Sequence, residues 1–128
     1  MAKIQEYETV TNIVCHYIKK DIQSIGELSR WLFAATSMNE FTIKKILLIN
    51  TENKDFGSST EIRIADICFN LSKYICDTRA DFICVCLQYS ETNMVIGINL
   101  NDWTCSISTN KENVAKIQQV VQLLKLEH

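Results

Sequence analysis

The sequence has no proline and only three glycines among its 128 residues. A glycine-rich phosphate cradle needs several glycines close together, and neither G-x-G-x-x-G nor G-x-x-x-x-G-K-[ST] occurs. Histidine is also scarce. His128 belongs to a C-terminal Leu-Glu-His (residues 126–128) that is typical of the start of a vector-encoded tag. His16 alone remains for a catalytic triad, so no catalytic residues are predicted.

A strong charge of one sign is lacking as well. Lys and Arg number 13 against 15 for Asp and Glu, a formal charge of -2. Nucleic-acid binders usually carry a basic excess that neutralises phosphates, so we expect no nucleic-acid partner. No apolar run approaches the ~18 residues of a membrane span, and the N-terminus shows no secretory signal. We therefore expect a cytoplasmic protein without membrane association.

The composition that is present suits a compact soluble domain, with 47% hydrophobic and 22% charged residues. We expect one domain over residues 1–125, with the tag remnant at 126–128 excluded. All six cysteines fall within apolar patterns, which favours reduced core residues over disulfides. Cys84 and Cys86 would share one face of a strand, but no second cysteine pair follows to complete a zinc site. No metal and no cofactor are predicted.

Alternating and continuous apolar runs predict strands in the second half of the chain. The stretches 82–89, 94–100 and 103–107 read as three consecutive strands of an antiparallel meander. An earlier run over 41–50 reads as a buried strand. Gly97 interrupts the second meander strand on the face opposite its apolar residues, which indicates a close approach by a neighbouring backbone or helix.

Helical patterns flank these strands. Capping boxes begin at Ser24, Ser58 and Thr109, each with Glu three residues later and an apolar-periodic run behind it. Residues 4–22 form a further helical pattern before the first box. The expected fold is α/β (α+β), a single-domain helix–sheet sandwich in the order α-α-β-α-β-β-β-α. Its sheet has about four strands, including the antiparallel meander.

Size, fold class and the lack of catalytic motifs favour a non-catalytic protein-binding module. The main hypothesis is an inhibitor or immunity-type protein that neutralises a toxin or effector through a tight protein–protein complex. Charged and aromatic loop residues are the expected contacts. They are Glu52, Asp55, Glu91, Asp102 and Trp103.

Two alternatives stay open. One is a small scaffold or secretion-chaperone-like adaptor that acts as a homodimer through an edge strand or a helix. The other is an enzyme with an unrecognised carboxylate or cysteine site. A reactive thiol at Cys84, Cys86 or Cys105 would favour the enzyme, because reactivity requires a lowered pKa and access to solvent.

Overall fold

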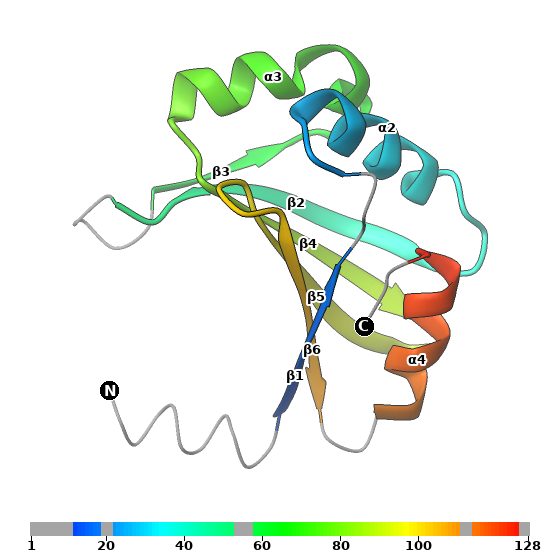
Figure 1. Cartoon of the computed structure of the whole chain (residues 1–128). Helices are drawn as coiled ribbons and strands as arrows, with labels where there is room; N and C mark the ends of the chain where they lie inside the picture. Colours follow the sequence, from blue (N-terminus) through cyan, green and yellow to red (C-terminus); the bar gives the residue numbers. More distant parts are fainter. Residues whose placement is uncertain (1–11, 19–21, 53–57, 111–113, 126–128) are drawn as a thin grey trace.

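The computed structural model describes residues 12–18, 22–52, 58–110 and 114–125. The predicted tag remnant at 126–128 and the predicted contact residue Asp55 lie outside these ranges, as do residues 4–11 of the first predicted helix. Within the described ranges the chain forms a mixed α+β fold, as the sequence predicts (Figure 1). No helix of the described residues is long and apolar enough to cross a membrane.

The centre of the fold is one six-stranded sheet in the order β1-β6-β5-β4-β2-β3. Every neighbouring pair of strands is antiparallel, so no parallel crossover occurs among the described residues. The predicted meander forms the middle of this sheet and is confirmed. The strands are β1 (Asn12–Ile18), β2 (Thr42–Asn50), β3 (Ser58–Ile62), β4 (Phe82–Tyr89), β5 (Thr92–Asn99) and β6 (Thr104–Asn110).

Three α-helices of the described residues pack against one face of the sheet (Figure 1). They are α2 (Ile25–Thr36), α3 (Ile67–Thr78) and α4 (Val114–Leu123), and the short 3-10 helix η1 (Ile64–Asp66) leads into α3. The strand residues that alternate toward the helices are buried, among them Ile46, Ile83, Val85, Ile96 and Ile107. This face and the apolar stripes of the helices form one continuous core.

Two segments that the sequence predicts as helical form edge strands instead. Residues 12–18 form β1 instead of a helix, pairing with β6 from Asn12 opposite Asn110 to Ile18 opposite Thr104. The segment is rich in β-branched and aromatic residues that suit a strand, and it takes the free edge of β6. Residues 58–62 form β3 against β2, so the Ser58 capping box does not start a helix. The sheet therefore has six strands instead of about four.

The two remaining predicted capping boxes, at Ser24 and Thr109, differ in the structure. The Ser24 box forms: its hydroxyl oxygen accepts a hydrogen bond from the Glu27 amide at 3.2 Å and caps α2. The third box begins inside β6, and its Glu112 lies outside the described residues. Thr109 is buried in β6, and its hydroxyl donates to the carbonyl oxygen of Asn93 at 3.0 Å. The last helix itself is confirmed as α4.

An aromatic ring on the neighbouring strand β4 leaves no room for a side chain at Gly97. A Cβ atom added at Gly97 would lie 2.5 Å from Cζ of Phe82 and 3.0 Å from Oγ of Ser106. The ring of Phe82 therefore lies over Gly97 on the face of the sheet that points away from the helices. The predicted close approach is real, but it comes from a side chain instead of a backbone or helix.

Candidate functional site

Three loops meet at one end of the sheet, which we call the Trp103 end. They are the turn at 51–52 after β2, the link 79–81 between α3 and β4, and the hairpin 100–103 between β5 and β6. The strand registers place them together, because Ile49 pairs with Phe82 and Phe82 pairs with Asn99. Of the predicted contact residues, Glu52, Asp102 and Trp103 lie at this end.

Glu91 lies at the opposite end of the sheet. It occupies the two-residue turn between β4 and β5, where Tyr89 pairs with Thr92. Both turn residues have positive φ, 48° at Ser90 and 65° at Glu91, which is the type I′ geometry favoured in tight hairpins. The structure thus separates Glu91 from the other described contact residues, and one flat partner surface at the Trp103 end would not reach it.

Asp81 holds the three loops of the Trp103 end together. Its carboxylate accepts hydrogen bonds from the backbone N–H and the hydroxyl of Thr51, and its backbone carbonyl accepts one from the Leu100 N–H at 2.9 Å. The Thr51 hydroxyl and then the Thr51 N–H lower the pKa of Asp81, so its ionised form is favoured. These contacts join residues about 20 to 30 positions apart, so no local sequence pattern indicates them.

The hairpin that carries Trp103 is braced by its own side chains. Oδ1 of Asn99 accepts from the Asn101 N–H at 2.8 Å, and Oδ1 of Asp102 accepts from the N–H and hydroxyl of Thr104 at 3.0 and 2.7 Å. The Thr104 hydroxyl and then its N–H lower the pKa of Asp102. The backbone N–H of Trp103 closes the loop by donating to the backbone carbonyl of Asn99 at 2.9 Å.

Trp103 adopts a backbone conformation that large side chains rarely take. Its φ is 60°, in the left-handed region that glycine and asparagine occupy more readily. Its side chain is half-buried and packs against the edge of the core. Such strain, of order ~1 kcal/mol, persists where surrounding contacts fix it, and it gathers at functional positions. Trp103 is therefore a rigidly held aromatic residue at an exposed loop.

A second candidate surface is the sheet face opposite the helices, called here the open face. Directly paired strand residues share a face, so Leu47 lies beside Cys84, Ile49 beside Phe82, and Cys86 beside Val95. Val95 is 38% exposed and the others are half-buried. No helix of the described residues lies against this apolar patch, which is bordered by polar β6 residues and by the Lys45–Glu61 ion pair at 3.9 Å.

The open face corrects the prediction for two cysteines. Cys84 and Cys86 do share a face of β4, but they point away from the helices and are half-buried instead of lying in a doubly covered core. The apolar run 82–87 suggested burial on both faces, yet only Ile83, Val85 and Leu87 enter the core. Cys105 is buried as predicted, whereas Cys76 is exposed.

Two of the described thiols, those of Cys84 and Cys105, are shifted away from the reactive thiolate form. Burial raises the pKa of Cys105 to about 12, and burial followed by the neighbouring Cys86 raises the pKa of Cys84. A nucleophilic cysteine needs the opposite shift. In the part of the chain that the structure describes, no three His, Cys, Asp or Glu side chains gather as a metal site would require.

Comparison of the chain with protein-family models, with curated proteins and with solved structures finds no match. The Trp103 end and the open face are two surfaces of the described residues that suit contact with another protein.

Proposed function

We propose that this protein is a non-catalytic binding module of the inhibitor or immunity type, which engages its target through the Trp103 end of the sheet. The observation that carries the proposal is the left-handed backbone of Trp103 in a hairpin braced by Asn99 and Asp102. An aromatic side chain held in place before binding loses little conformational entropy in the complex.

The charges around Trp103 indicate the kind of target. Among the described residues of the three loops, carboxylates outnumber cations: Glu52, Asp81 and Asp102 against Arg79. Asp81 and Asp102 are held ionised by their hydrogen bonds. An acidic rim around an aromatic anchor suits a basic protein surface, because complementary potentials speed association and select partners.

Affinity capture from a lysate of the source organism, followed by native mass spectrometry, tests the proposal. We expect one basic protein in a 1:1 complex. Its capture should fall sharply with Trp103→Asn and with the double variant Glu52→Gln/Asp102→Asn. Glu91→Gln is the matched control, since it removes a carboxylate from the opposite end of the sheet and should retain the partner. Equal loss with the control would contradict the assignment of the surface.

The open face supports a second candidate, a small scaffold or secretion-chaperone-like adaptor that acts as a homodimer. The observation that supports this candidate is the apolar patch of Leu47, Ile49, Phe82 and Val95. A second copy of the chain would cover this patch face to face. Sedimentation velocity distinguishes the two candidates. A dimer that Val95→Lys converts to monomer would favour the scaffold, and a monomer at every concentration would exclude this dimer.

A further inference from the structure

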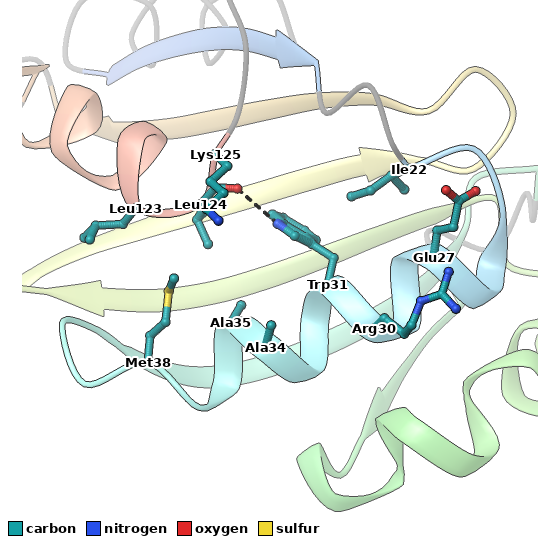
Figure 2. A pocket seen from close by; sticks show the side chains of 10 residues that line it. All are labelled: Ile22, Glu27, Arg30, Trp31, Ala34, Ala35, Met38, Leu123, Leu124 and Lys125. Carbon is teal, nitrogen blue, oxygen red and sulfur yellow. Dashed lines mark hydrogen bonds between the residues drawn. The ribbon is translucent and has the colours of Figure 1, made fainter.

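A cavity lies between α2 and the C-terminal end of α4, away from the Trp103 end and from the open face (Figure 2). Its form follows from the order of side chains along α2. Trp31 reaches across to α4, and its indole Nε1 donates a hydrogen bond to the carbonyl oxygen of Leu124 at 3.1 Å. One turn later the small residues Ala34 and Ala35 leave the space between the two helices unfilled.

The walls of this cavity are mainly apolar. Ile22, Ala35 and Leu124 are buried, and Trp31 and Met38 are half-buried. The volume is about 350 Å³, which lies at the lower end of the ~300–1,000 Å³ typical of small-molecule sites. An apolar body of modest size therefore fits the cavity, with the indole of Trp31 as one wall.

Among the described residues, the charged groups that line the cavity stand at its margins. Figure 2 shows Glu27 and Arg30 together at one end and Lys125 beside Leu124 at the other. The Glu27 carboxylate is engaged at the start of α2, where Oε1 accepts from the Ser24 hydroxyl at 3.0 Å and from the Gln23 N–H at 3.4 Å. Two cations against one engaged carboxylate favour an anionic ligand over a neutral or cationic one.

We propose that this cavity binds a small amphipathic carboxylate, an acyl or aryl chain whose apolar body lies against Trp31 and whose carboxylate lies at the Arg30 end of the cavity. Burial of the chain against Trp31, Met38 and Leu124 supplies the apolar part of the affinity. The two cations supply the preference for an anion. This site is independent of the proposed protein-binding surface, because it shares no residue with the Trp103 end.

Tryptophan fluorescence tests the proposal directly, since the chain has only two tryptophans. In the Trp103→Phe protein, Trp31 is the only reporter, and octanoate should change its emission in a saturable way. The Trp31→Phe protein, which reports from Trp103 alone, should show no such change. 1-Octanol and octylammonium should each bind about tenfold more weakly than octanoate, the loss expected without a hydrogen bond to a charged group.

Three further variants separate binding in the cavity from nonspecific binding. Arg30→Gln/Lys125→Gln should bring octanoate and 1-octanol to equal affinity. Ala34→Phe should weaken both ligands by filling the cavity, whereas Ala115→Phe, on the exposed side of α4, should leave both unchanged. Absence of saturation by octanoate, equal binding of 1-octanol to the parent protein, tighter binding of octylammonium, or an equal response from Trp103 would each overturn the proposal.

Discussion

The carboxylate of Asp81 accepts two hydrogen bonds from Thr51, one from the backbone N–H at 2.9 Å and one from the hydroxyl. This pair joins the turn after β2 to the start of β4, and the Asp81 carbonyl extends the link to Leu100 in the next hairpin. Asp81 therefore contacts both neighbouring loops at the Trp103 end, the turn at Thr51 through its side chain and the hairpin at Leu100 through its backbone. Removing that carboxylate should affect both stability and the binding surface.

Asp81→Asn should lower the free energy of unfolding by about 1 kcal/mol at pH 7, because the hydrogen bonds to an ionised carboxylate are lost. The Thr51 hydroxyl and N–H lower the folded-state pKa of Asp81, so its contribution is present above the unfolded pKa of ~3.9. The contribution disappears as the pH falls through the folded pKa. The difference between wild type and variant in urea unfolding should thus shrink toward pH 3.

Asp77→Asn is the matched control for this experiment, since it removes an exposed carboxylate from α3. It should change the free energy of unfolding by less than ~0.5 kcal/mol. A difference for Asp81→Asn that stays constant from pH 7 to pH 3 would show that its carboxylate contributes no ionised hydrogen bonds.

Gly97→Ala should destabilise the protein by about 1–3 kcal/mol, because the new methyl group meets the Phe82 ring at 2.5 Å. Replacing Phe82 by leucine removes the ring and should make room for the new methyl group at position 97. In a double-mutant cycle, Phe82→Leu/Gly97→Ala should then be more stable than the sum of the single changes predicts. Strict additivity in urea unfolding would show that the ring does not lie over Gly97.

Glu91→Gly should raise the free energy of unfolding by about 0.5–1 kcal/mol. Relief of the positive φ at the second turn position should outweigh the extra flexibility that glycine gives the unfolded chain. Thermal unfolding followed by circular dichroism measures the effect. Partner binding should be unaffected, because this turn lies at the opposite end of the sheet from Trp103. A fall in Tm would mean that the Glu91 side chain makes a stabilising contact.

Cysteine alkylation tests whether the open face is accessible to solvent. Among the four cysteines whose exposure the structure describes, Cys76 is exposed and should react fastest with iodoacetamide in the folded protein at neutral pH. The half-buried Cys84 and Cys86 should follow. Cys105 should react only after unfolding, since it is buried and its pKa is raised to about 12. Peptide mass spectrometry resolves the sites. Protection of Cys84 and Cys86 equal to that of Cys105 would mean that another layer covers this face.

Local sequence patterns predicted the elements that are stabilised by their own residues and by near neighbours. Ser24 and Glu27 begin α2 as their spacing indicated, and the alternation from Met94 to Ile98 defines β5. The missed strands β1 and β3 lie at the two edges of the sheet. Both strands form by pairing with the free edges of β6 and β2, and the hydrophobic period within 12–18 or 58–62 does not indicate that pairing.

The candidate site was predicted in part for a similar reason. Charged and aromatic residues in turns pointed to Glu52, Asp102 and Trp103, and the strand registers bring these three to one end. The same rule also chose Glu91, because composition cannot tell which end of a sheet a hairpin occupies. Asp81 was not predicted as a site residue, because its contacts are with Thr51 and Leu100, which are distant from it in the sequence.

The most direct test is the affinity of the captured partner for Trp103→Asn, measured beside the free energy of unfolding of the same variant. Asparagine tolerates the left-handed backbone, so relief of strain should offset the lost packing, and stability should stay within about 1 kcal/mol of wild type. We predict that affinity falls at least ~30-fold, as for the loss of a central aromatic anchor. A stable variant that binds its partner as tightly as wild type would contradict a binding surface centred on Trp103.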